Sequence, residues 1–151
     1  MSAFTVRPLE PADHDQWLPL WQGYQAFYRV ALPEEVTATT WQRFHDPAEP
    51  MRAFGAFDGE RLLGIVHCIF HRTCWSIAPS CYLQDLFTAE DARGRGVARA
   101  LIDTVCEAAR AEGAARVHWL THESNATARA LYDRIAEASG FVQYRINLPP
   151  R

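Results

Sequence analysis

The sequence predicts an α/β (α+β) fold in which helices flank a mixed, mostly antiparallel sheet. Two observations carry this prediction. Apolar runs flank Asp58 and Gly59, and an Asp-Gly pair between two such runs is a strong signal of an antiparallel hairpin. Farther along, a strand pattern ending at Phe87, a helix pattern from Val97 and a strand pattern from Arg116 follow one another. This order is typical of a crossover between parallel strands.

Composition predicts a single domain, residues 1–151. The chain is 48% hydrophobic and 22% charged, which suits a domain that buries its own core. Its formal net charge of −3 and the lack of a basic run argue against a nucleic-acid partner, because binding a phosphate backbone requires a positive face. The sequence shows no secretory signal pattern and no apolar run near the roughly 20 residues of a membrane span. We therefore expect no membrane partner and a cytoplasmic location.

The cysteines and histidines do not predict a metal site. The four cysteines show no Cys-x-x-Cys spacing, and we expect reduced thiols. His67 and His71, like His118 and His122, are four residues apart in strand-like sequence, where that step spans about 13 Å. One ion cannot bridge that distance. His122, at the end of its strand, is the only one of these kept as a candidate site residue.

The first half of the chain predicts a short strand and two helices. The strand covers residues 4–7 and is closed by prolines. Asp13 is placed to cap a helix over residues 14–29, which carries aromatic and apolar side chains at three- and four-residue steps. A second, weaker helix pattern covers residues 34–45, after a break at Pro33.

The first helix has an unusually aromatic face, which is expected to pack on the core. Trp21, Tyr24 and Tyr28 on this face could also line a substrate site, because aromatic rings attract ammonium groups. Glu34 and Glu35 begin the second helix. They are either solvated carboxylates that suit the helix dipole or residues that select a cationic substrate.

Strand and helix patterns continue through the rest of the chain. A strand over 80–87 leads into a glycine-rich loop, and Leu83, Asp85 and Phe87 are expected on one face of it because side chains alternate along a strand. The other predicted elements are strands over 52–57, 61–70, 116–121 and 141–148, a helix over 97–112, and a helix from Ser124 or Asn125 to about 138.

The glycine-rich loop predicts an anion site. The first N–H groups of a helix lack intrahelical partners and lie at the positive end of its dipole, so a phosphate gains several donors there. The glycines allow a close approach of the backbone. A dinucleotide site of the Rossmann type is disfavoured, because Arg99 stands in place of a third glycine. The loop reads Arg93-Gly94-Arg95-Gly96-Val97-Ala98.

This loop resembles the acyl-CoA signature of the Gcn5-related N-acetyltransferases (GNAT): Arg or Gln, two free positions, Gly, one free position, and Gly or Ala. Downstream, Asn125, the Leu131-Tyr132-Asp133 run and Gly140-Phe141 resemble the second signature of the family. The long stretch between Tyr132 and Gly140 is similar to the small polyamine- and histone-type branch.

The resemblance implies an acetyl-CoA-dependent domain with a V-shaped splay between the fourth and fifth strands. The pyrophosphate of acetyl-CoA would rest on the amides of the glycine-rich loop. The pantetheine arm would run beside the strand that ends at Phe87, where a backbone N–H would polarise the thioester carbonyl. The cofactor-binding residues implied are Phe87, Thr88, Arg93, Gly94, Arg95, Gly96, Val97, Ala98, Asn125 and Arg129.

The resemblance also implies catalytic residues. Tyr132 would donate a proton to the departing CoA thiolate. In the polyamine and diamine enzymes a Glu commonly precedes the Asp of the fourth strand and is the base, but here that position is Gln84, which cannot accept the proton. Asp85 is then the first candidate base, with His122, Glu123 or a water chain as alternatives. A purely structural role for Asp85 in a hydrogen-bond network is equally compatible with the sequence.

The expected reaction is transfer of an acetyl group to a primary amine of a small cationic substrate, by direct attack in a ternary complex. A homodimer through the strand over 141–148 is expected from the same branch. The alternative is a non-catalytic acyl-CoA-binding or regulatory module, which would need neither Tyr132 nor Asn125.

Overall fold

A computed structural model describes residues 3–150 of the chain. They form two compact units, one ending at Leu120 and the other beginning at Thr121. The first unit contains the sheet and helices α1 to α3, and the second contains α4 and the C-terminal segment. No helix of the described chain has the length and apolar character that crossing a bilayer requires.

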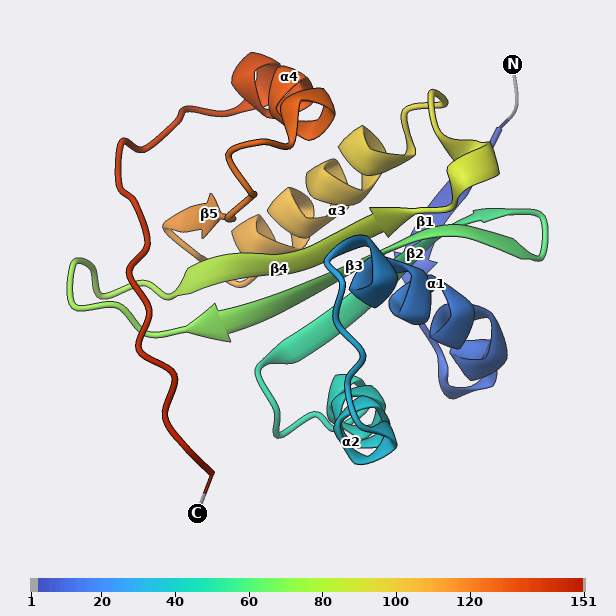
Figure 1. Cartoon of the computed structure of the whole chain (residues 1–151). Coiled ribbons are helices and arrows are strands. Elements are labelled where there is room, and N and C mark those ends of the chain that lie inside the picture. Colours follow the sequence, from blue (N-terminus) through green and yellow to red (C-terminus); the bar gives the residue numbers. More distant parts are fainter. Residues whose placement is uncertain (1–2, 151) are drawn as a thin grey trace. The chain divides into compact units, whose positions relative to one another are not determined.

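The sheet of the first unit is mixed and mostly antiparallel, as predicted (Figure 1). Its strands lie in chain order, and each pair of neighbours is antiparallel except β4 and β5, which run parallel and are joined through α3. The hairpin expected at Asp58 and Gly59 joins β2 to β3, and Gly59 adopts the left-handed conformation with φ of 59°. The strands are β1 (Thr5–Pro8), β2 (Met51–Asp58), β3 (Arg61–His71), β4 (Ser80–Thr88) and β5 (Arg116–His118).

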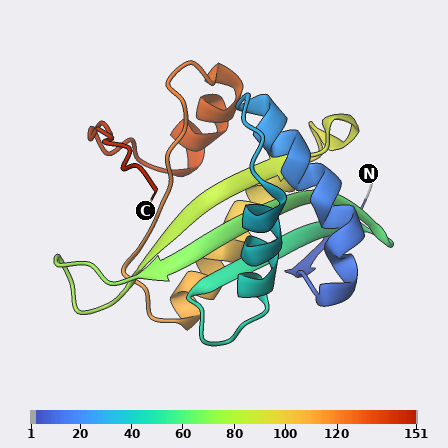
Figure 2. The ribbon, with the colours of Figure 1, turned by 60° about the horizontal axis from the view of Figure 1, so that its bottom comes forward.

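Helices cover both faces of this sheet (Figure 2). α1 (His14–Phe27) and α2 (Glu34–Phe44) lie on one face and α3 (Val97–Ala111) on the other. Gly64 of β3 lets α3 approach closely, because a Cβ there would lie 2.8 Å from Cγ1 of Val97. The buried stripe of α3 consists of Val97, Leu101, Ile102, Val105 and Ala109.

The core beneath α1 is aromatic. Trp17 is fully buried and Trp21 is 6% exposed. Asp13 is the N-cap residue of α1, as predicted, but its carboxylate makes no cap hydrogen bond to that helix. It accepts two hydrogen bonds from Arg7, at 2.8 and 3.0 Å, and one from the Glu10 N–H at 2.7 Å. The guanidinium of Arg7 competes successfully for the carboxylate because a bidentate charged pair is stronger than a single cap bond. The buried residues of this cluster are Leu9, Trp17, Trp21, Ala53, Phe57, Leu62 and Ile65.

A β-bulge interrupts β4. His67 of β3 pairs with Asp85, but the next residue of β3 pairs with Leu83, so Gln84 is an extra residue in β4. The bulge breaks the alternation of side chains, and Tyr82 and Asp85 consequently lie on the same face. The prediction that Leu83 shares the face of Asp85 is wrong for this reason.

The parallel pairing of β4 and β5 is short. Only Ser80 to Tyr82 of β4 pair with β5, which ends at His118 rather than at residue 121. The backbone of β4 from Leu83 to Thr88 is therefore unpaired on that side within residues 3–150. This is the predicted splay between the fourth and fifth strands.

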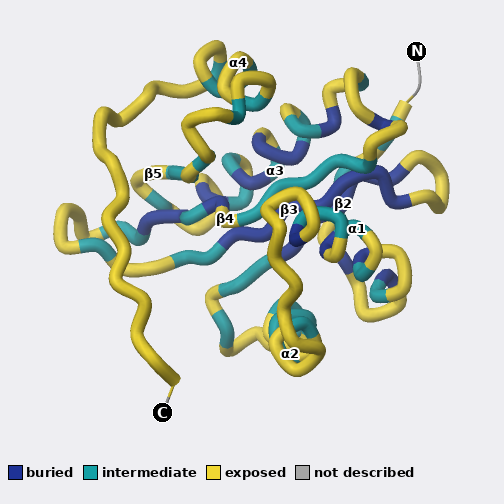
Figure 3. The backbone as a smooth tube through the Cα atoms, in the orientation of Figure 1, coloured by how far each residue is buried: buried dark blue, intermediate teal, exposed yellow. Residues whose placement is uncertain are grey.

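The second unit differs most from the sequence prediction. α4 (Ala126–Ile135) ends before residue 138, and the predicted strand over 141–148 is wrong, because residues 136–150 form neither helix nor strand. A strand requires a partner for its N–H and C=O groups, and residues 141–148 pair with no part of the described chain. Figure 3 shows this segment coloured as exposed along its length. Its exposed apolar residues are Phe141, Val142, Tyr144, Ile146 and Leu148.

Candidate functional site

Asp85 lies at the centre of a hydrogen-bonded cluster on the α1 face of the sheet. Its Oδ2 atom is 3.0 Å from Nδ1 of His67, and the hydroxyl of Tyr24 lies near the same carboxylate. The Nε1–H of Trp17 donates to Nε2 of His67 at 3.0 Å. The side chains of His67 and Asp85 are 3% and 13% exposed. The structure thus joins a predicted site residue, Asp85, to a histidine that the sequence does not single out for chemistry.

Three aromatic side chains of α1 line the same region. The rings of Trp21 and Tyr24 stack with centroids 5.3 Å apart, and Tyr24 meets Tyr28 edge to face at 5.0 Å. Burial, followed by the nearby charge of Asp85, raises the pKa of both tyrosines above its usual value. Both hydroxyls therefore stay protonated at neutral pH and act as donors.

Trp21 adds an unused donor to this region. Its ring is 5.0 Å from that of His67, and its Nε1–H is buried without a hydrogen-bond partner among residues 3–150. A buried donor with no acceptor is costly, since it has lost its hydrogen bonds to water. A bound molecule with an acceptor group would satisfy it.

The glycine-rich loop has the geometry of an anion site. Gly94 and Gly96 have φ of 81° and 83°, and a Cβ at either position would meet no described atom within 4 Å. Gly96 precedes α3, whose first turn has no acidic residue and no side-chain cap. The first intrahelical bond is donated by Ala100 to Gly96, so the earlier amides are left for a ligand.

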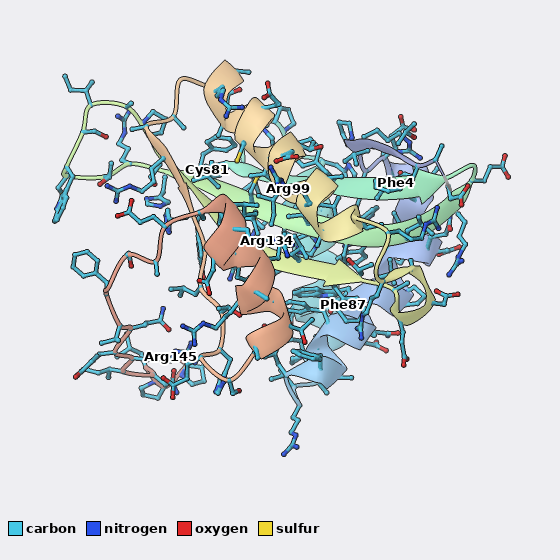
Figure 4. The ribbon with its side chains drawn as sticks, turned by 90° about the horizontal axis from the view of Figure 1, so that it is seen from above. Phe4, Cys81, Phe87, Arg99, Arg134 and Arg145 are labelled. Atoms are coloured by element: carbon cyan, nitrogen blue, oxygen red, sulfur yellow. The ribbon has the colours of Figure 1, made fainter. Side chains whose placement is uncertain are left out.

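The arginines around this loop have different neighbours. Arg95 is paired with Asp58 at 3.1 Å, and its buried Nε has no partner in the described part of the chain. Arg99, labelled on α3 in Figure 4, is paired with Asp103 at 3.2 Å. The guanidinium of Arg93 lies 5.7 Å from the ring centroid of Phe87 on β4. This contact places a side chain of the loop before α3 next to the end of β4.

The open edge of β4 offers backbone donors. The Ala89 N–H donates to the Leu63 carbonyl of β3 at 2.8 Å. Hydrogen-bond directions alternate along a strand, so the amide of Phe87 also points toward β3, whereas those of Leu86 and Thr88 point to the open edge. The predicted donors near Phe87 are accordingly the amides of its two neighbours. The Thr88 hydroxyl is buried without a partner within residues 3–150.

The second unit positions the other predicted residues. Asn125 is the N-cap of α4, as predicted, and its side chain accepts from the Ala128 N–H at 3.4 Å. Tyr132 is half-buried, two turns into the helix. Arg129 donates to the Glu123 carbonyl at 2.8 Å. His122 and Glu123 are both exposed in the turn before α4.

Glu34 is exposed at the start of α2 and lines a cavity of about 210 Å³ between α1 and α2. Its lining includes no member of the Asp85 cluster. The lining residues are His14, Leu18, Gln22, Gln25, Leu32, Glu34, Thr37 and Ala38.

The histidines combine in an unexpected way. His71 and His118, one from each of the two pairs noted in the sequence, have their Nε2 atoms 3.1 Å apart, and the ring of Tyr82 stacks on that of His118. The described residues contain no group of three or more His, Cys, Asp or Glu side chains that could hold a metal ion. All four cysteines are free.

Sequence reasoning did not identify His67 or Trp17 as parts of the site. A usable signal was present, because His67 is a polar residue within the apolar run Leu62–Phe70 of a buried strand. A buried polar side chain requires a partner. The identity of that partner depends on the register of β3 with β4 and on the bulge at Gln84.

Comparison with known proteins gives consistent matches. A model of the acetyltransferase (GNAT) family matches residues 17–136. A D-amino-acid N-acetyltransferase of Saccharomyces cerevisiae is 37% identical over 144 residues, covering 94% of this chain and 89% of that protein.

Solved structures share the fold at low identity. An aminoglycoside N-acetyltransferase in complex with CoA superposes with a TM-score of 0.85 at 17% identity, over 97% of this chain and 96% of that one. A ribosomal-protein-alanine N-acetyltransferase from Brucella melitensis gives a TM-score of 0.79 at 23% identity, over 97% and 99% of the two chains.

Proposed function

Because the chain belongs to the acetyltransferase (GNAT) family, and is an N-acetyltransferase that uses acetyl-CoA, we propose that its acceptor is a small molecule with an ammonium group. The observation that carries this proposal is the Asp85 carboxylate, set against aromatic rings of α1 on the part of β4 that has an open edge. A carboxylate and aromatic faces both attract an ammonium group.

Amino acids are the first candidate acceptors. The relative that is 37% identical acts on D-amino acids by its name. An amino acid carries an α-ammonium group that suits Asp85 and a carboxylate that can accept from a donor. The unpartnered Nε1–H of Trp21 supplies such a donor near Asp85.

Acetyl-CoA supplies the acetyl group as a thioester, and the residues present fit it. The uncapped start of α3 would hold the pyrophosphate, since its first amides are free to donate. The amides of Leu86 and Thr88 and the unpartnered Thr88 hydroxyl would bind the pantetheine arm and the thioester carbonyl. Asn125 and Arg129 of the second unit are assigned to the same cofactor by their match to the family signature.

The proposed reaction is a direct transfer in a ternary complex. Asp85 takes a proton from the ammonium group, because an amine with a pKa near 10.4 is otherwise protonated and cannot attack. The freed amine would then attack the thioester carbon and the C–S bond would break, with Tyr132 donating its proton to the departing sulfur. The second proton lost by the amine nitrogen would restore the Tyr132 hydroxyl. In this scheme Trp21, Tyr24 and Tyr28 bind the acceptor. Glu34 and His122 are secondary candidates for acceptor binding.

We further propose that the two compact units act as one catalytic domain. The family match supports this, because residues 17–136 extend across the boundary at Leu120. A cytoplasmic location is also proposed and is supported by the four free cysteines, which suit a reducing compartment.

The C-terminal segment is proposed to pair with a second copy of the chain. Val142, Tyr144, Ile146 and Leu148 alternate with polar residues, as in a strand with one apolar face, and each is more than three-quarters exposed in the single chain. A long exposed apolar segment is a ready site of strand pairing. Pairing of these segments from two copies of the chain would form a homodimer.

An acceptor screen tests the proposed function. We expect acetyl-CoA turnover with amino acids, D-isomers among them, and slower turnover with polyamines and simple alkylamines. Release of the CoA thiol is the measurement, and the N-acetylated form of each amino acid is the matched control, since it lacks the attacking amine. Turnover with none of the free amines would contradict an acetyltransferase of small amines and favour a binding module.

Substitution in the loop tests the pyrophosphate site. Gly96→Glu should weaken CoA binding by about tenfold or more, since it brings a negative charge to the start of α3. Gly113→Glu is the control, because Gly113 also has a left-handed φ, of 72°, and open surroundings, but follows the other end of α3. Isothermal titration with CoA gives both affinities. Equal affinities for the two variants would refute the assignment.

The catalytic assignments predict two separate losses. Asp85→Asn and Tyr132→Phe should each lower kcat by roughly 10²–10⁴-fold, the usual contribution of a general base or acid. Asp85→Asn should also flatten the acidic limb of the pH profile. Asp91→Asn is the control for loss of a carboxylate, since Asp91 is exposed and paired with Arg61. A kcat unchanged in either variant removes that residue from the mechanism.

Light scattering after gel filtration tests the dimer. We expect a dimer for the full chain and a monomer when residues 141–151 are removed. Ile146→Asp should also dissociate it, because it places a charge on the apolar side of the segment. Asn147→Asp adds the same charge on the polar side and should remain dimeric. A full chain that is monomeric at all concentrations tested would overturn the proposal.

A further inference from the structure

The environment of His67 determines where its ring carries a proton. Trp17 can only donate from Nε1, so Nε2 of His67 at 3.0 Å must be the acceptor. A neutral imidazole has one N–H, which is then on Nδ1. Nδ1 therefore donates to Oδ2 of Asp85 at 3.0 Å. In this chain of hydrogen bonds Trp17 donates, His67 accepts at Nε2 and donates at Nδ1, and Asp85 accepts.

The same bond keeps the ring of His67 neutral. A charged imidazolium has an N–H on both nitrogens, and its Nε2–H would face the N–H of Trp17 with no acceptor between them. His67 thus supports the Asp85 carboxylate without neutralising its negative charge, whereas a charged histidine would form an ion pair with it.

We propose that His67 is a positioning residue for proton abstraction: held by Trp17 in its Nδ1–H form, it fixes the Asp85 carboxylate and leaves its charge available to the ammonium group of the acceptor. This inference rests on the proposed role of Asp85 as the base.

The other groups near this pair do not supply a competing charge. From α1, Tyr24 and Tyr28 face Asp85 as neutral hydroxyls. From α2, Phe44 packs on His67 with ring centroids 4.5 Å apart. Tyr82 of β4 lies on the same face, and burial lowers the pKa of its stacking partner His118 of β5, which favours the neutral form of that ring.

Ring nitrogen shifts test the geometry without reference to activity. In ¹⁵N-labelled protein, long-range ¹H–¹⁵N spectra should show a protonated Nδ1 and an unprotonated Nε2 for His67 at pH 7, with His67→Asn identifying the signals. Trp17→Phe removes the donor to Nε2, so the proton of His67 should no longer be confined to Nδ1. Trp41→Phe, which alters a ring tilted against Trp17 with centroids 4.6 Å apart, should leave it unchanged. A protonated Nε2 in the wild type overturns the inference.

Kinetics test the role. His67→Leu should lower kcat by roughly 10–100-fold, as expected for loss of a hydrogen bond to a charged group. It should also move the acidic limb of the pH profile to higher pH, because that bond favours the ionised carboxylate. His67→Asn retains an N–H near the position of Nδ1 and should restore most of kcat. The KM for acetyl-CoA should change little in both.

Equal losses in the Leu and Asn variants, or no loss in either, overturn the positioning role. If His67→Leu does not fold, Trp17→Phe compared with Trp41→Phe answers the same question through kcat and the pH profile. A wild-type protein that acetylates no amine refutes the proposed function instead, and the tautomer of His67 can still be read in that case.

Discussion

The bulge at Gln84 is the constraint on which the site depends. One extra residue in β4 turns Asp85 to the face covered by α1, where His67 and Tyr24 meet its carboxylate. Without it, strict alternation would place Asp85 and Tyr82 on opposite faces. Bulges redirect side chains in this way near active sites. Here the bulge also lies in the part of β4 that β5 no longer pairs with, so the carboxylate and the open edge occur together.

The polar cluster is stable because every member has a partner in an otherwise apolar core. Trp17 packs in the aromatic cluster beneath α1 and uses its only polar group for His67. A buried polar chain is favourable only when its hydrogen bonds are satisfied. The cluster ends at Asp85, whose carboxylate can accept more hydrogen bonds than the one that His67 donates. The buried Nε1–H of Trp21 has no acceptor among residues 3–150, so this region also contains a donor without a partner.

Local features were predictable and long-range ones were not. The hairpin at Gly59, the loop before α3 and the cap at Asn125 depend on a few consecutive residues, so the sequence indicates them. The Trp17–His67 contact joins residues 50 positions apart through the packing of α1 on β3. The His67–Asp85 contact depends on the register of β3 with β4, which no short pattern encodes. The strand predicted over 141–148 failed for a related reason: its alternation specifies one apolar face, but pairing requires a partner strand.

The difference between local and long-range features explains why the sequence indicates the cofactor site more readily than the acceptor site. An anion site at a helix start is built from adjacent backbone amides and glycines, so a motif of six residues describes it. The proposed acceptor site draws on α1, β3 and β4, and its side chains have positions that depend on packing. Proteins with this fold act, by their names, on aminoglycosides and on a ribosomal protein, while a sequence relative acts on D-amino acids. This pattern is consistent with the proposal that the acetyl donor binds at the start of α3 and that the side chains on the α1 face select the amine.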